Sequence, residues 1–429
     1  MKKFPTLICI AAFIISSAVA QEKQMQFYRP ADQSGVNVFE PSKKDTVDFN
    51  GMYVKLGGNF ALQYQDLNHT NTALKKLNAD GKNLNELLEI GPGFNLATAN
   101  MNIDAQLDDG ISLSLVTYLS SRHHQEAWVK GGYLQFDKLP FLKSAFADRI
   151  MENVRIKVGH MEINYGDAHF RRTDNGNAFH NPFVGEYIMD AFTTEIGGEI
   201  YYMNKGVIVM GGMTSGEIKG DITKPDQRKP SFLGKLGYDG YLMDNLRVRL
   251  TGSVYHTDKS VSNTLYSGDR TGSRYYLVME NILASTTSQF TSGRFNPGFK
   301  DKITAFVVNP FIKFHGLELF GNFEQAEGRA AEELTTRKWQ QMGGDLLYRF
   351  GKREQFYLGG RYQMASGEMV NYTVKPEITR MQFAGGWYVT KNILAKVEYV
   401  TQEYKDFAPT DIRNGGKFDG IIIEGAIAF

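Results

Sequence analysis

Apolar and polar residues alternate along most of this chain. Between residues 53 and 65, Val54, Leu56 and Phe60 fall on one face of an extended chain, and Lys55 and Asn59 fall on the other. This period of two indicates β-strands whose two faces meet different surroundings. It predicts strands over 51–65, 94–107, 111–120, 127–137, 154–163, 192–203, 207–214, 231–242, 246–257, 302–314, 317–325, 338–350, 354–366, 378–390, 393–404 and 418–429.

The connections between these segments alternate in length. Short turns lie at 108–110, 204–206, 315–316, 351–353 and 391–392. Long polar loops run over 65–90, 120–127, 164–190, 215–230, 325–337, 366–377 and 405–417. A soluble sandwich has no reason to keep this asymmetry, whereas it is typical of an outer-membrane barrel with short periplasmic turns and long extracellular loops.

The end of the chain supports the same fold. Ile421, Ile423, Ile427 and the terminal Phe429 share one face of the last strand, which resembles the C-terminal signature of Gram-negative outer-membrane barrel proteins. Both chain ends should lie on the short-turn side, so the strand number should be even. We therefore expect an all-β fold, a transmembrane antiparallel β-barrel of about sixteen strands. In this assignment residues 258–301 form one long outer loop. If that loop instead contains a hairpin, the barrel has eighteen strands.

The N-terminus carries an export signal. Lys2 and Lys3 precede an apolar run over 7–15, and Ala18-Val19-Ala20 ends the segment. This pattern predicts a cleavable signal peptide over 1–20 and places the mature chain, from residue 21, in the cell outer membrane. Residues 21–50 lack alternation and are assigned as an N-terminal periplasmic extension, by default a disordered leader. A plug and an oligomerisation arm are the alternatives.

Composition narrows the function classes. No apolar run of about eighteen residues follows position 20, so helical membrane spans are excluded. The formal charge is +1 and becomes −1 when Lys2 and Lys3 leave with the signal, which argues against nucleic acid as a partner. Aromatic residues reach 13% and glycines number 44, which suits strand walls and interfacial girdles. The single cysteine, Cys9, lies in the signal segment, so thiol chemistry is excluded from the mature chain.

The charged faces of the strands must point into the barrel, because charges facing lipid are costly. A barrel of this size encloses an aqueous channel. On this register cations outnumber anions in the lumen, which favours anionic solutes; a mixed-charge wall that only keeps the channel wet is the alternative. The predicted pore-lining residues are Arg155, Lys157, Arg247, Arg249, Arg349, Arg361, Arg380 and Lys396.

Residues 164–190 form the most unusual connection, because Phe170, Phe179 and Phe183 give a polar loop apolar anchors. The loop resembles the porin loop that follows the fifth strand, folds into the barrel and sets its constriction. The stretch 155–199 also resembles the phosphate-selective and related porin-like proteins of Bacteroidota. The core of that resemblance is His169-Phe170-Arg171-Arg172. It implies a pore constriction formed by His169, Arg171, Arg172, Asp174 and Asn175.

An alternative reading gives Arg171 and Arg172 an anchoring role against wall carboxylates such as Glu195 or Glu199. The function that follows is a porin for passive diffusion of small hydrophilic, anionic solutes. We expect no enzyme activity, cofactor or metal. Outer-membrane lipid and the solutes are the expected partners, with a homotrimer or an accessory partner as candidates for assembly. The alternatives are a structural or accessory subunit of an outer-membrane complex, and a hydrophobic-compound transporter with an N-terminal hatch.

Overall fold

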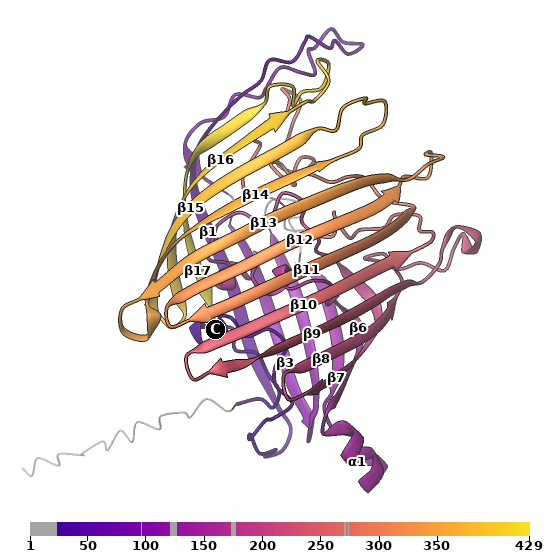
Figure 1. The fold of residues 1–429 in the computed structure, drawn as a ribbon, viewed down its shortest axis with the longest axis vertical. Helices are drawn as coiled ribbons and strands as arrows, with labels where there is room; N and C mark the ends of the chain where they lie inside the picture. The colour runs from indigo at the N-terminus through magenta and orange to yellow at the C-terminus, as the bar shows by residue number, and fades with distance from the viewer. Residues whose placement is uncertain (1–23, 96, 121–126, 173–176, 270–271, 273) are drawn as a thin grey trace, which may run out of the picture.

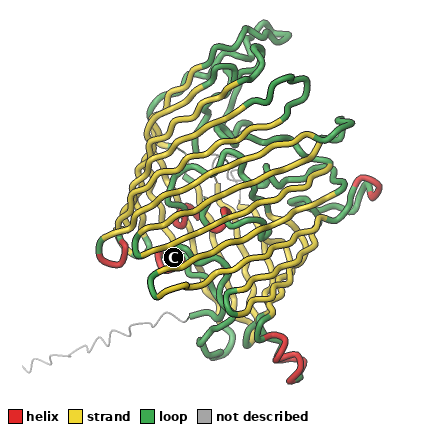
Figure 2. Tube along the Cα trace, in the orientation of Figure 1, coloured by secondary structure: helices red, strands yellow, loops and turns green. Residues whose placement is uncertain are grey.

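The computed structural model describes residues 24–429 except 96, 121–126, 173–176, 270–271 and 273, and shows a closed barrel of antiparallel strands (Figures 1 and 2). Residues 1–20, the expected signal peptide, lie outside the described residues. The strands are β1 (Tyr53–Thr70), β2 (Gly93–Phe94), β3 (Thr98–Asp108), β4 (Ile111–Ser120), β5 (Ala127–Phe136), β6 (Val154–Glu162), β7 (Thr194–Asn204), β8 (Val207–Thr214), β9 (Ser231–Met243), β10 (Leu246–Thr257), β11 (Lys302–Phe314), β12 (Leu317–Arg329), β13 (Arg337–Phe350), β14 (Phe356–Gly367), β15 (Glu377–Thr390), β16 (Ile393–Lys405) and β17 (Lys417–Ala428).

Sixteen long strands make the barrel wall. Each pairs with its neighbour along the chain, and β17 returns to β1 over the register Asn59↔Ala428 to Thr70↔Lys417, which closes the sheet. The two-residue β2 is an extra strand that pairs with β1 beside β3. Among the described residues of 258–301 there is no strand, so the sixteen-strand prediction is confirmed and the eighteen-strand alternative is wrong.

The two faces of each strand separate as the alternation predicts. On β13, Trp339, Gln341 and Asp345 are buried inside the barrel, and Met342 and Leu346 are exposed on its outer surface. Because side chains of a strand point alternately to opposite faces, the same pattern repeats around the wall. The outer face is an apolar belt suited to lipid, and the inner face is polar and charged.

Helices are few and short. The α-helix α1 (Ala145–Met151) lies in the β5–β6 connection and projects from the turn end of the barrel (Figure 1). Within the described part of the chain, no helix has the length and apolar character needed to cross a bilayer. The 3₁₀ turns are η1 (Gln33–Gly35), η2 (Pro140–Leu142), η3 (Ala168–Phe170), η4 (Asn177–His180), η5 (Pro225–Gln227) and η6 (Lys352–Glu354).

Residues 25–40 run inside the barrel and residues 42–45 lie at its turn end, so the expectation of a disordered leader is wrong. The Tyr28 hydroxyl donates to Asp104 on β3 at 3.3 Å, and the Asn37 amide donates to Glu318 on β12, across the lumen. Phe39 is buried inside. The segment stays in the lumen because its polar groups form hydrogen bonds with the charged inner wall and its aromatic side chains are buried away from water.

Candidate functional site

Three segments enter the lumen: residues 25–40 and the described parts of the β6–β7 loop 163–193 and of the β10–β11 loop 258–301. Phe39 packs edge-to-face on Phe170 and Phe311, with ring centroids 5.7 and 5.4 Å apart. The lumen of this sixteen-stranded barrel is therefore largely filled by its own chain rather than open across its width. Buried apolar residues of the three segments include Phe39, Phe179, Phe183, Val184, Ile188, Leu265, Tyr275 and Val278.

Wall side chains hold the β6–β7 loop by its backbone. The Lys396 ammonium donates to three loop carbonyls at 2.9–3.2 Å, Arg361 donates to the Gly185 carbonyl at 3.0 Å, and Arg380 donates to the Glu186 carbonyl at 2.7 Å. A loop with little secondary structure needs such partners, because buried backbone groups without hydrogen bonds are costly.

Most of the predicted pore-lining cations are covered by these segments. Except for Lys157 and Arg247, all are buried. Each buried cation except Arg380, which donates to Gln402, also meets a carboxylate, so its charge is neutralised locally. The pairs are Arg155–Asp137, Arg249–Asp167, Arg349–Glu318, Arg361–Asp345 and Lys396–Glu424, at 2.5–2.9 Å, and the partly exposed Arg247 meets Asp239 at 2.7 Å.

Arg171 has an anchoring position rather than an open eyelet position. Its side chain is 3% exposed, donates to Asn37 and lies 3.6 and 3.9 Å from the carboxylates of Glu318 and Asp345. Its guanidinium also covers the ring of Phe320 at 5.1 Å. Arg171 therefore contacts wall carboxylates, as the anchoring alternative expects, but not the two carboxylates named for it. The carboxylates that we expected for it, Glu195 and Glu199, instead bind Thr214, Tyr255, Tyr201 and the Asn164 backbone.

Arg172 belongs to a buried group that we call the inter-loop charge cluster, formed by Arg172, Glu186, Asp190, Asp269 and Arg294. Arg172 meets Asp190 at 2.7 Å and Asp269 at 2.5 Å, and Arg294 meets the same two carboxylates at 2.5 and 3.2 Å. Two members come from loop 258–301 and three from loop 163–193. The cluster therefore ties the two infolded loops together inside the barrel.

Glu186 makes this cluster sensitive to pH. Burial raises the pKa of Glu186 to about 7, although Arg294 and Arg172 oppose the shift. Below that pH the cluster holds two cations and two anions; above it Glu186 adds a third anion beside Asp190 and Asp269. A carboxyl whose pKa is raised in the folded state stabilises that state at low pH and loses this contribution as pH rises through the raised value.

We expect the two loops to loosen between pH 5 and pH 8. Hydrogen exchange of loop 163–193, corrected for the intrinsic effect of pH, should be more than tenfold faster at pH 8 than at pH 5, since the pKa of Glu186 rises from 4.5 to about 7 and each pKa unit corresponds to a factor of ten. The Glu186→Gln variant keeps the neutral form and should lose this dependence. Equal pH dependence in the wild type and the variant would show that another group controls the loops.

His169 lines a cavity beside loop 163–193. Its ring bonds Glu162 and, at 3.0 Å, Asn164. Asp174 and Asn175 lie outside the described residues. Of the five expected constriction residues, the structure thus places His169 at an opening, buries Arg171 and Arg172 in ion pairs, and leaves two undescribed.

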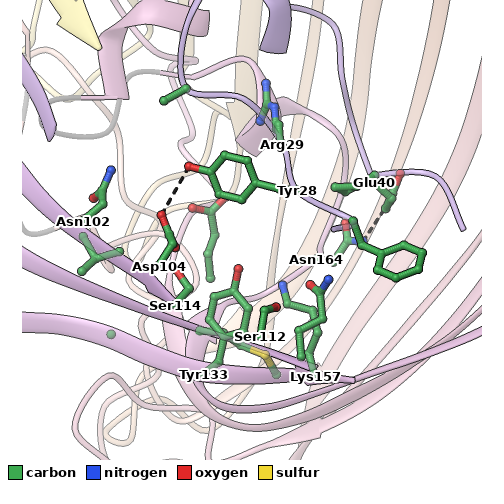
Figure 3. A pocket seen from close by; sticks show the side chains of 18 of the residues that line it. Tyr28, Arg29, Glu40, Asn102, Asp104, Ser112, Ser114, Tyr133, Lys157 and Asn164 are labelled. Atoms are coloured by element: carbon green, nitrogen blue, oxygen red, sulfur yellow. Dashed lines mark hydrogen bonds between the residues drawn. The ribbon is translucent and has the colours of Figure 1, made fainter. Parts of the chain in front are cut away.

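That opening is a cavity of about 330 Å³ between residues 25–31 and the inner face of β3–β6, which we call the wall cavity (Figure 3). Its wall is a row of polar side chains on neighbouring strands. The strand register places Asp104 opposite Ser114, and Ser114 opposite Tyr133. Lys157 stands over the Tyr133 ring at 4.4 Å. Within the described residues Lys157 has no ion-pair partner, so its charge remains available to a solute.

A second cavity of about 1430 Å³, which we call the turn-side cavity, opens at the short-turn end of the barrel. Phe27, Phe39 and Glu40 line both cavities, so the two cavities adjoin at a short part of the N-terminal segment. Glu40 is fixed there by Arg249 at 2.8 Å and Lys235 at 3.3 Å. Burial alone would raise the pKa of Glu40, but the two cations outweigh it and hold the pKa at about 2.

Sequence reasoning missed the N-terminal segment as part of the site. Phe27, Tyr28 and Phe39 stand in a polar stretch, which is the same signal that predicts an infolded loop over 164–190. Applied to 21–50, that signal favours the plug alternative.

Comparison with known proteins identifies the fold. Neither a family model nor a curated protein sequence matches this chain. Among solved structures, the anion-selective porin from Comamonas acidovorans is 12% identical, with a TM-score of 0.52 over 88% of this chain and 100% of that porin. A loop-deletion mutant of OmpT, an outer membrane protein of Vibrio cholerae, is 11% identical, with a TM-score of 0.51 over 89% and 100%. The outer membrane channel DcaP of Acinetobacter baumannii is 10% identical, with a TM-score of 0.50 over 89% and 99%. The chain shares the barrel fold of outer-membrane porins.

Proposed function

We propose that this protein is an outer-membrane channel for passive diffusion of small hydrophilic solutes, with a preference for anions. The path follows the inner face of β3–β6 through the wall cavity and leaves by the turn-side cavity. The observation that carries the proposal is the wall cavity, which has polar and charged side chains in its lining and persists beside the infolded segments. Export by a signal peptide over 1–20, and kinship with the phosphate-selective porin-like proteins of Bacteroidota, belong to the same proposal.

Lys157 supports the anion preference. Its ammonium lies in the wall cavity, and the described residues provide no carboxylate that neutralises it there. An unpaired cation in a narrow, weakly screened passage lowers the energy of a passing anion and raises that of a cation. The predicted pore-lining role is thus proposed for Lys157. The other predicted pore-lining cations influence the path indirectly, by binding the chain segments that fill the lumen.

The Lys157→Gln variant should lower the anion-to-cation permeability ratio several-fold, because it removes this charge without changing the wall. The ratio comes from the reversal potential of a bilayer under a KCl gradient. Lys338→Gln is the matched control, since Lys338 is exposed near the outer end of β13. If both variants keep the wild-type ratio, Lys157 does not set selectivity.

A filled lumen also favours a second candidate, a structural or accessory subunit of an outer-membrane complex. Such a subunit would give folded protein without conductance and would co-purify with a stoichiometric partner. A carrier of hydrophobic compounds with an N-terminal hatch fits less well. The N-terminal segment does enter the lumen, but the cavity beside it is lined by Asp104, Lys157 and Arg155 rather than by apolar side chains alone.

Assembly as a homotrimer is also proposed. A trimer form is known for Vibrio cholerae OmpT, which is 10% identical to this chain with a TM-score of 0.50. Cross-linking in native membranes tests it: a ladder ending at three copies supports the trimer, and monomers alone contradict it.

A further inference from the structure

The β5–β6 connection differs from the other connections at the turn end of the barrel. It runs over residues 137–153, whereas β3–β4, β7–β8, β9–β10, β11–β12 and β15–β16 are joined by two residues each. The connection holds η2 and α1 and projects from the rim of the barrel (Figure 1). A tight turn would have joined β5 to β6, so the additional chain has a role other than closing the barrel.

The connection exposes large apolar side chains. Phe146 and Ile150 of α1 are 75% and 43% exposed, and Phe141 and Leu142 of η2 are 59% and 51% exposed. Phe146 and Ile150 are four residues apart and therefore share one side of the helix. Four such side chains in one short segment form a patch of the kind that is normally covered by lipid or by another protein.

The segment is fixed to the barrel, so this exposure does not come from fraying. The Ser144 hydroxyl caps α1 by accepting from the Ala147 backbone at 3.4 Å. Met151 is buried, and the Asn153 carbonyl accepts from the Met203 backbone at 2.7 Å at the end of β7. The helix thus uses one side to dock on the rim and presents the other outward.

The patch continues the lipid-facing belt. Val154, which begins β6, pairs with Tyr202 on β7, and Tyr202 is exposed on the outer surface. Val158 and Ile200 extend this outer surface along the same two strands. Tyrosine at the end of an apolar belt is typical of the membrane–water interface. The helix therefore ends where the bilayer headgroups should lie.

Two exposed cations suit a phospholipid surface as the occupant. Lys143 and Arg149 flank the apolar side chains and have no ion-pair partner in the described part of the chain, while Asp148 and Glu152 are exposed in the same segment and balance their charge. Exposed cations beside exposed aromatic and aliphatic groups are the composition of helices that lie in the headgroup region, with the cations at lipid phosphates.

We propose that residues 138–153 form a membrane-interface anchor. In this arrangement α1 lies in the headgroup region of the periplasmic leaflet, Phe146 and Ile150 enter the acyl boundary, and Lys143 and Arg149 bind anionic phospholipid headgroups. The anchor fixes the depth of the barrel at the β5–β6 side, next to the wall cavity. This inference rests on the outer-membrane location in the proposed function but not on conduction, so either can fail without the other.

Site-directed spin labelling tests the anchor in full-length protein carrying Cys9→Ser, since Cys9 is the only cysteine of the chain. Labels are placed by Phe146→Cys, by Leu334→Cys in an exposed outer loop and by Phe306→Cys in the lipid-facing belt. The protein is reconstituted in phosphatidylcholine vesicles with and without phosphatidylglycerol. Collisions with oxygen, which concentrates in lipid, are compared with collisions with a water-soluble nickel complex.

In vesicles with phosphatidylglycerol, the label at position 146 should favour oxygen over nickel several-fold more than the label at 334, and approach the label at 306. Adding Lys143→Gln and Arg149→Gln should raise its nickel accessibility several-fold; an unchanged value overturns the role of the cations. A label at 146 as accessible to nickel as that at 334 overturns the anchor. Shielding from both reagents also overturns it, because a protein surface would then cover the patch.

Discussion

Deletion of residues 24–50 should raise the single-channel conductance several-fold. This segment crosses the lumen from β3 to β12 and packs Phe39 between Phe311 of the wall and Phe170 of loop 163–193. It also narrows the point where the wall cavity and the turn-side cavity adjoin. Conductance rises with the water-filled cross-section, and a barrel of sixteen strands is wide enough to enclose an aqueous channel once its filling is removed.

The deletion needs a control for folding, which the shift of folded barrels on unheated gels provides. Lys43→Met is a milder companion variant, because it removes the ion pair with Asp137 at 2.9 Å that ties the segment to the wall. It should increase the frequency of brief openings without a permanently larger pore. Wild-type conductance in a folded deletion variant would mean that the N-terminal segment does not obstruct the path.

The Arg172→Met variant should release the two infolded loops from each other. Removing one partner of a buried ion pair leaves the remaining charges uncompensated and costs about 3–5 kcal/mol. Here Arg294 would be left to face both Asp190 and Asp269. Amide protection of loops 163–193 and 258–301 in hydrogen-exchange mass spectrometry should fall together, while the barrel strands keep theirs.

Lys375→Met serves as the comparison, since its pair with Glu368 at 3.1 Å is exposed and such pairs contribute about 0–1 kcal/mol. Its loop protection should match the wild type. Full protection of both loops in Arg172→Met would contradict the account, because the inter-loop charge cluster would then carry no part of the docking energy.

The barrel was predictable because its determinants are local. A period of two in the sequence reports directly which face of a strand meets lipid, and the short turns make neighbours in the sequence neighbours in the sheet. The ends of the strands were harder to predict. The polar stretch after Gln65 still pairs with β17, so β1 continues to Thr70 where the sequence reads as a loop.

The interior was less predictable because its partners lie far apart along the chain. The sequence shows that Arg249 and Arg361 face the lumen. It does not show that the first meets Asp167, eighty-two residues earlier, or that the second meets the Gly185 carbonyl. Residues 21–50 lack periodicity in the sequence. The place of residues 25–40 inside the barrel depends on hydrogen bonds with wall residues that are distant in sequence, such as Asp104 and Glu318.

Bilayer recording of the wild-type protein in KCl tests the central claim most directly, that a narrow water-filled path runs along β3–β6 beside the filled part of the lumen. We expect a small ohmic conductance whose reversal potential under a salt gradient has the sign of anion preference. Folded, heat-modifiable protein that gives no current above the bare bilayer would contradict this account, whether or not the variant lacking residues 24–50 conducts.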